Sequence, residues 1–430
     1  MSRGAGGHQF LLGTGDRGGF ESGALPPGSR WVGLRCDSRM AQALDQIFVQ
    51  LKHAVVGYFP ATWQPWISVV LSIVPILMVF PLLFALTTVV ERKMLGRIQN
   101  RYGPNRVGPY GFLQFAADGI KSLTKEDIVP IAADRLVHFL APLALLVPVL
   151  LSYAVLPFGR GMVIWDLDVG VLFFFAVGAA SELAVFMAGW SSRNKYALLG
   201  AMRAIAQMIS YEVPLILGAV GVVVVVGSLN PGTIVEAQSG YWGWVPHWHV
   251  FTPWGFAAFI VFMISAAAEA NRSPFDIPEG ESEIVAGYFI EYSGFKFALF
   301  FLAEYLGLFA ISGMGITLFL GGWNAPLPWL AWTPSWFWFF AKLVGIILMF
   351  IWVRGTLPRM RMDQLMNFAW KFLLPMALFA LMGAGFWVLL GAGLARWVVA
   401  GLLVVLPYWF LGRGLTLAAG RGRRKYRLAD

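Results

Sequence analysis

Four glutamates interrupt long apolar stretches of this 430-residue chain: Glu182, Glu212, Glu269 and Glu304. A carboxylate is costly inside a bilayer, so it usually faces the interior of a helix bundle and marks a proton or ion pathway. Glu182 and Glu212 each lie roughly 12 Å from the basic end of their stretch, at 1.5 Å per residue. We therefore expect all four acids in one half of the membrane, lining a water-accessible funnel. The alternative is a structural pair with a lysine, arginine or tyrosine for each acid.

A loop after the fifth apolar stretch adds three more carboxylates, Glu279, Glu281 and Glu283. Their spacing of two prevents them from sharing a helical face, and Pro278 and Gly280 predict an irregular loop. Like charges this close repel one another, so desolvation would raise the pKa of at least one carboxyl toward neutral pH. Such a group exchanges protons, although the spacing alone favours a solvated acidic loop.

The elements that position these acids must cross a membrane. Apolar residues make up 58% of the chain and charged residues 13%, with 19 tryptophans, which excludes an ordinary soluble enzyme, a coiled coil, a disordered protein and a disulfide scaffold. Irregular backbone facing lipid leaves amide groups unsatisfied, so the spans should be helices. We predict an all-α, polytopic transmembrane helix bundle with nine spans, at about 66–90, 136–156, 171–190, 204–227, 254–270, 296–320, 336–353, 372–390 and 394–412.

Basic residues concentrate in alternate loops. Lysine and arginine gather at 91–135, 191–203, 271–296, 354–371 and after 412, whereas 228–253 and 321–335 contain none. The positive-inside rule places the first set in the cytoplasm, with an external N-terminus and an internal C-terminus. The net charge of +9 then reflects orientation in the membrane, and we expect no nucleic-acid partner.

The N-terminal segment fits this topology badly, because it carries six basic residues on the predicted outer side. We expect residues 1–60 to be an N-terminal extension. It is either a disordered tail, or part of it is a mis-assigned start and translation begins at Met40. From Met40 the chain reads as an amphipathic lead-in. The membrane domain should then occupy 61–392 and a further helix with a basic tail 393–430.

The first basic loop contains a second amphipathic pattern. Apolar residues fall at helical spacing between polar ones, and the segment is too polar to span, so it predicts a helix lying in the membrane interface. The alternative is a short soluble helix. The apolar positions are Phe112, Leu113, Phe115, Ala116, Ile120 and Leu123.

Other classes of site have weak support. The single cysteine, Cys36, cannot hold an iron–sulfur cluster, which needs about four ligands, so any redox centre must belong to another chain. His247 and His249 flank one tryptophan in a predicted outer loop but have no cysteine or acid beside them. We predict no metal site.

Two long motifs carry a resemblance to a known family. The first is Glu91-Arg-Lys-Met-Leu-Gly-Arg-Ile-Gln-Asn-Arg-Tyr-Gly-Pro-Asn-Arg-Val-Gly-Pro109, and the second is Ala268-Glu-Ala-Asn-Arg-Ser-Pro-Phe-Asp-Ile-Pro-Glu-Gly-Glu-Ser-Glu-Ile-Val-Ala-Gly287. Both resemble signatures of the H-subunit family of the proton-pumping NADH–quinone oxidoreductase, respiratory complex I. The likeness covers about 66–390. The family usually has eight spans, so 394–430 looks like an added ninth helix.

The resemblance implies a subunit of a translocase in the bacterial inner membrane that forms the quinone-binding chamber and the path of the isoprenoid tail. The substrate would be ubiquinone or menaquinone, with nothing bound covalently, and flavin and iron–sulfur clusters only in partner subunits. Implied partners are the peripheral-arm quinone-site subunits, small membrane subunits and lipid. Acids at Glu182, Glu212, Glu269, Glu279, Glu281, Glu283 and Glu304 would couple quinone chemistry to protons.

The resemblance also places basic residues near the quinone, at Arg92, Arg97, Arg272, Arg354 and Arg359. Arg272, Phe275 and Asp276, framed by two prolines, suit one wall of a headgroup cavity. Positive-inside anchoring is the alternative role for the arginines. Two other functions remain open: the corresponding subunit of a hydrogenase or other-donor dehydrogenase, and a stand-alone ion transporter.

Overall fold

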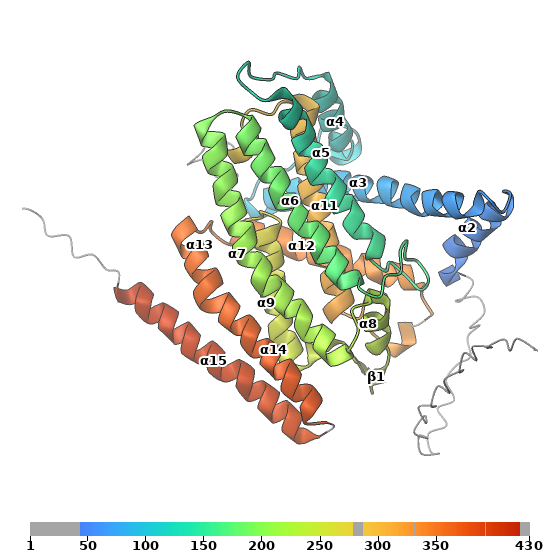
Figure 1. Ribbon diagram of the computed structural model, residues 1–430, viewed down its shortest axis with the longest axis vertical. Coiled ribbons are helices and arrows are strands. Elements are labelled where there is room, and N and C mark those ends of the chain that lie inside the picture. Colours follow the sequence, from blue (N-terminus) through green and yellow to red (C-terminus); the bar gives the residue numbers. More distant parts are fainter. Residues whose placement is uncertain (1–43, 278–286, 331, 392, 422–430) are drawn as a thin grey trace, which may run out of the picture. The chain divides into compact units, whose positions relative to one another are not determined.

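The computed structural model describes residues 44–277, 287–330, 332–391 and 393–421, and all of them belong to one compact unit, Arg39–Asp430. This part of the chain is helical apart from loops and one short hairpin, which pairs β1 (Tyr241–Trp242) with β2 (Val245–Pro246) (Figure 1). The predicted all-α, polytopic fold is therefore confirmed.

Each of the nine predicted spans is a helix. The helices are α3 (Gln64–Ile98), α5 (Arg135–Ser152), α6 (Gly170–Ser191), α7 (Lys195–Val226), α9 (Pro253–Glu269), α11 (Gly294–Phe319), α12 (Ser335–Thr356), α14 (Leu374–Leu389) and α15 (Leu394–Arg421). Within the described residues, eight helical segments are long and apolar enough to cross a membrane. The remaining span, α9, has 17 residues, which is at the lower limit for crossing.

Shorter helices connect the spans. The segment predicted as an interfacial helix is α4 (Gln114–Thr124), which confirms the amphipathic pattern and leaves Ile120 and Leu123 exposed. The other short α-helices are α2 (Ile47–Gly57), α8 (Pro231–Ala237) and α13 (Met362–Phe368), and 3-10 turns lie at Pro109–Gly111, Tyr153–Val155, His249–Phe251, Gly287–Phe289 and Pro328–Leu330. A π-helical turn, Ala369–Leu373, joins α13 to α14.

The ends of the helices differ from the predicted span boundaries. An apolar stretch shows only which part of a helix lies in the lipid, whereas the helix itself begins and ends at its capping residues. α7 begins at Lys195, nine residues before the apolar stretch predicted at 204, and the side chain of Asn194 caps it by accepting from Tyr196 N at 3.0 Å. The loop predicted at 354–371 contains α13. Glu212 therefore lies near the middle of a long helix, and the depth count from residue 204 does not start at the helix end.

Close helix crossings bring the acids together. At Gly189 on α6, an added Cβ would lie 2.4 Å from the Cβ of Ala201 on α7, so only glycine allows this approach.

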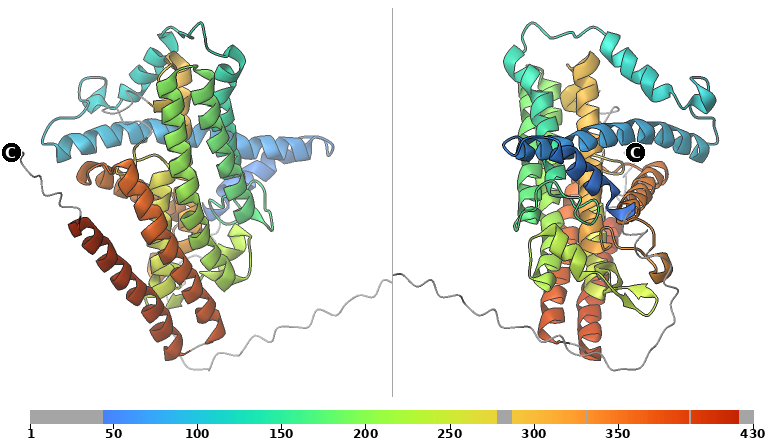
Figure 2. Two further views of the ribbon diagram at one scale, coloured as in Figure 1. Left: turned by 60° about the vertical axis from the view of Figure 1, so that its left-hand side comes forward. Right: turned by 90° about the vertical axis from the view of Figure 1, so that its right-hand side faces the viewer.

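α3 runs across the direction of α5, α6, α7 and α11, while α14 and α15 form an antiparallel pair (Figures 1 and 2). The C-terminal turns of α3 thereby reach α11 and α12.

Loops of the same predicted side meet one another. At the end with the basic loops, Lys296 pairs with Asp127 at 2.7 Å and Asn194 donates to Glu291 at 2.6 Å. Contacts at the opposite end include Asn230 to Asp166 at 2.7 Å and Gln238 Nε2 to the Thr317 carbonyl at 2.9 Å. The two sets of loops therefore lie at opposite ends of the spans.

The amphipathic lead-in predicted after Met40 is helix α2. Its apolar residue Phe48 packs edge-on against Trp336 with ring centroids 5.6 Å apart. The buried carboxylate of Asp45 accepts from the backbone N–H of Ser335 at 2.7 Å, and from the Ser335 hydroxyl. Asp45 therefore caps the N-terminus of α12 from 290 residues away in the sequence.

Candidate functional site

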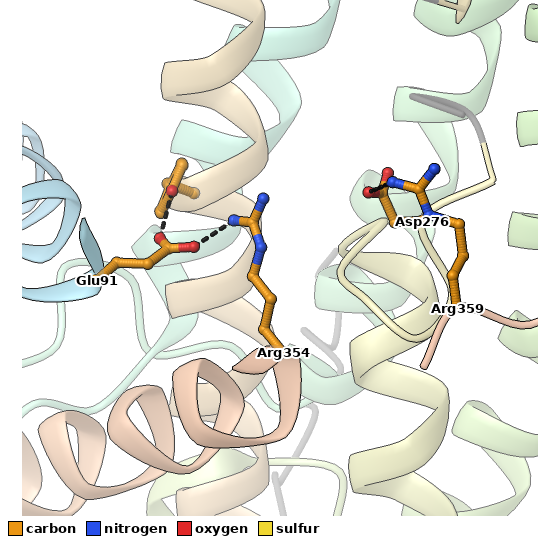
Figure 3. Close-up of polar contacts among 5 residues, drawn as sticks. Glu91, Asp276, Arg354 and Arg359 are labelled. Carbon is orange, nitrogen blue, oxygen red and sulfur yellow. Dashed lines mark hydrogen bonds and ion pairs between the residues drawn. The ribbon is translucent and has the colours of Figure 1, made fainter. Parts of the chain in front are cut away.

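A buried ion pair joins α3 to α12 at the end with the basic loops. Glu91, whose side chain is 7% exposed, accepts a hydrogen bond from Arg354 Nη1 and another from the Tyr305 hydroxyl at 2.5 Å (Figure 3). Arg354 was expected near the quinone, whereas Glu91 and Tyr305 were not selected. Glu91 is the first residue of the first motif that carries the family resemblance, which was the available signal. Arg354 is 30% exposed, so the pair lies at the edge of the buried interior, with only the carboxylate fully enclosed.

Arg272 joins the same cluster from the loop after α9. Its guanidinium carbon lies 3.8 Å from the centroid of the Tyr305 ring, within the range of a cation–π contact. Arg272, Glu91 and Arg354 line one cavity of about 10 Å³ with Tyr305, which is room for about one water. Two arginines that the sequence placed separately near the quinone therefore lie in one cluster.

Glu304 carries the polar groups deeper into the bundle. It lies beside Tyr305 on α11 and accepts a hydrogen bond from the Tyr288 hydroxyl at 2.9 Å. Glu304, Tyr288 and Glu269 also line a cavity of about 80 Å³, where Oε2 of Glu269 is buried and has no hydrogen-bond partner among the described residues. Such a cavity holds several waters when it offers polar partners, as this one does. Water would thus connect Glu304 with Glu269.

Glu182 and Glu212 form a carboxyl pair beyond Glu269. Their side chains lie on the neighbouring helices α6 and α7 and interact electrostatically with each other and with Glu269. The four acids selected from the sequence therefore lie along one route through the bundle.

A second ion pair holds the loop after α9 against the segment after α12. Arg359 Nη2 lies 2.7 Å from Oδ2 of Asp276, whose side chain is 6% exposed (Figure 3). Burial raises the pKa of Asp276, and Arg359, Arg354 and Arg272 oppose that shift. Phe275 packs on Tyr211 of α7 with ring centroids 5.4 Å apart. The loop is thereby fixed beside the Glu91–Arg354 cluster.

Other predicted site residues lie outside this buried cluster. Arg92 is half exposed and pairs with Asp118 at 2.5 Å, and Arg97 is exposed near the end of α3. Glu279, Glu281 and Glu283 are outside the described residues. Neither Arg92 nor Arg97 lines either of the two small cavities.

Histidines make no metal site in the described ranges, where no group of three or more His, Cys, Asp or Glu side chains could hold an ion. His249 is instead buried beside Trp254, with ring centroids 5.5 Å apart. Burial lowers the pKa of His249 to about 4.

His249 should make the loops at the end opposite the basic loops sensitive to acid. Its pKa is about 4 when folded and about 6.5 when unfolded, so the unfolded state binds more protons between these values. The stability from neutral His249 is present above pH 6.5 and is lost as pH falls toward 4, by on the order of 3 kcal/mol. We expect His249→Gln to reduce the drop in thermal denaturation midpoint between pH 7.5 and pH 5. The exposed His53→Gln should not, and an equal effect of both would contradict this role.

The fold and the buried polar route define a polytopic membrane protein that holds ionisable side chains inside its helix bundle. The family model described as NADH dehydrogenase matches residues 71–385. The chain is 44% identical over 333 residues to the H subunit of the NADH-quinone oxidoreductase of Rhodospirillum rubrum, covering 76% of this chain and 94% of that protein. It is 48% identical over 318 residues to the H subunit of the Dehalococcoides mccartyi enzyme, covering 74% and 86%. For the Geobacillus kaustophilus protein of the same name, the identity is 50% over 289 residues, covering 67% and 84%.

This chain therefore belongs to the H-subunit family of NADH-quinone oxidoreductase, as the two long motifs indicated. It is a membrane subunit of that enzyme class. The match ends before α15, so the ninth helix lies outside the part of the chain that the family model covers.

Proposed function

We propose that this chain forms the membrane wall of the quinone chamber in NADH-quinone oxidoreductase and couples quinone reduction to proton movement. The supporting observation is the route of ionisable groups from Glu91 and Arg354, past Glu304, to Glu269 and the Glu182–Glu212 pair. Each group along it has a neighbour able to give or accept a proton, directly or through water.

The arginine-rich end of the route suits the substrate. Quinone reduction adds electrons and protons to carbonyl oxygens, and fixed positive charge stabilises negative charge that develops there. Arg272 and Arg354 lie next to the carboxylates of Glu304 and Glu91. A change of charge on the quinone would therefore alter the balance between these arginines and their acids, and that change would pass to Glu269 and Glu212.

The chamber needs a second wall. The cavity lined by Arg272 and Arg354 holds about 10 Å³, much less than a quinone headgroup occupies. We infer that peripheral-arm subunits close the chamber over the loop at 270–277 and the segment after α12. Those partners would also supply the flavin and the iron–sulfur clusters that deliver electrons. Small membrane subunits and lipid would cover the remaining faces.

This arrangement requires the basic loops on the cytoplasmic side of a bacterial inner membrane. The described loops of that set meet at one end of the spans, as the alternating charge predicts. We expect a reporter fused after Asp430 to be active only in the cytoplasm. Activity on the outer side would reverse the side assigned to the C-terminus and remove α15 from the set of spans.

The Glu91–Arg354 pair provides a test of the proposed function. Glu91→Gln keeps an acceptor for the Tyr305 hydroxyl but removes the charge opposite Arg354. We expect quinone reductase activity of the assembled enzyme to fall about tenfold, the effect of one lost charge-assisted hydrogen bond. Oxidation of NADH by an artificial acceptor should stay unchanged.

Asp118→Asn is the matched control, because it breaks the exposed ion pair with Arg92, the residue that follows Glu91 on α3. Exposed pairs contribute little, so this variant should retain quinone reductase activity. Equal activity of Glu91→Gln and Asp118→Asn would remove the buried pair from the quinone chamber.

A further inference from the structure

Two adjoining cavities lie at the opposite end of the bundle from the Glu91–Arg354 pair. Their volumes are about 570 Å³ and about 200 Å³, and Arg160, Trp323 and Asn324 line both. The larger volume is within the range of sites for small molecules. The proposed quinone chemistry uses neither cavity.

Opposite charges face the larger cavity without pairing. Arg160, Asp166 and Glu236 all line it, yet the side chain of Arg160 makes no ion pair or hydrogen bond in the described part of the chain. The backbone N–H of Arg160 donates to the Ser335 hydroxyl at 3.2 Å, which ties this loop to the first residue of α12. Asp166 uses one oxygen to accept from Asn230 at 2.7 Å, which leaves the other free for a ligand. A cavity lined by a guanidinium and by carboxylates that do not pair with it suits a ligand that carries both a negative and a positive group, a zwitterion.

The surroundings of the cavity match the edge of a membrane. Trp165, which lines it, is 54% exposed, and tryptophan is enriched at the level of lipid headgroups. Leu151 in the last turn of α5 and Leu172 in the first turn of α6 are also exposed. These exposed side chains lie at the same end of the bundle as the cavity, and acyl chains of a lipid can lie against them.

We propose that this cavity, the outer vestibule, binds the headgroup of a phospholipid with a primary amine, such as phosphatidylethanolamine. Arg160 donates to the phosphate, because guanidinium forms strong hydrogen bonds with phosphate oxygens. The carboxylates of Asp166 and Glu236 accept from the ammonium group. The site thereby holds a lipid against α5 and α6 at the outer ends of the helices.

The test measures phospholipid retained by the whole purified enzyme complex, by mass spectrometry after exchange with phosphatidylethanolamine or phosphatidylglycerol. We expect the wild type to retain phosphatidylethanolamine in preference. Arg160→Gln should lower its retention about tenfold, as for one lost charge-assisted hydrogen bond, and Arg160→Lys should lower it less. Glu236→Gln should reduce the preference for phosphatidylethanolamine over phosphatidylglycerol.

Asp168→Asn is the matched control, because it removes an exposed acid from the same loop without changing the lining of the vestibule. It should retain lipid as the wild type does. The proposal would be overturned if the wild type retained both lipids equally. It would also be overturned if Arg160→Gln retained as much phosphatidylethanolamine as Asp168→Asn. Displacement of the lipid by inorganic phosphate alone would also overturn it, since that result assigns the vestibule to free phosphate.

Discussion

Glu212→Gln is expected to leave the enzyme assembled while quinone-coupled turnover falls roughly 100-fold, the lower end of what a positioned proton-transfer group contributes. Glutamine keeps the shape of the side chain and can hydrogen-bond Glu182, but it cannot exchange a proton. Because electron flow and proton movement are linked in the proposed function, loss of the proton step should slow both. Turnover with quinone and proton uptake by vesicles measure the effect.

Two variants make this result specific. Glu212→Asp keeps a titratable carboxyl on a shorter side chain and should retain part of the turnover. Asp168→Asn changes an exposed acid at the opposite end of the bundle and should keep the wild-type rate. Normal turnover and pumping by Glu212→Gln would make this residue structural. The proton route would then have to use the acids at 279, 281 and 283 alone.

Arg272→Ala should lower quinone reductase activity by about tenfold or more, while NADH oxidation by an artificial acceptor is unchanged. The substitution removes a buried guanidinium from the face of Tyr305 and from the electrostatic neighbourhood of Glu304 and Asp276. The two assays separate the quinone step from the flavin step, because only the first requires the chamber.

Charge and position are tested separately at this site. Arg272→Lys retains the charge but loses the planar group that stacks on Tyr305, so its activity should lie between those of wild type and alanine. Arg135→Ala removes an exposed arginine from the first turn of α5, where it lines neither small cavity, and should have little effect. Wild-type quinone reductase rates in an assembled Arg272→Ala enzyme would remove Arg272 from the quinone site.

The spans and the set of membrane acids could be predicted because both depend on local composition. An apolar stretch near 20 residues must be helical in lipid, and a glutamate within it has few alternatives to the bundle interior. Glu182, Glu212, Glu269 and Glu304 were selected on that ground alone. The structure arranges them along the cavity and the carboxyl pair described above.

The pairing of Glu91 could not be predicted in the same way. Glu91 and Tyr305 are 214 residues apart, and their contact depends on α3 crossing the other helices (Figure 2). The hydropathy pattern predicts that α3 exists, but it does not predict the direction in which α3 crosses the other helices. Glu91 also lies just beyond the predicted span, among basic residues, where a solvated acid is the ordinary expectation. Its burial follows from packing against α11 and α12.

The route from the arginines to Glu212 is tested most directly by locating the quinone in the purified enzyme. A photoreactive quinone analogue bound to the whole complex should label peptides of this chain around 270–277 or 354–361, and excess natural quinone should prevent the labelling. Arg272→Ala should reduce the same labelling. Protectable labelling confined to the outer loops, or to partner subunits far from Arg272, would contradict the assignment of the quinone chamber to this end of the bundle.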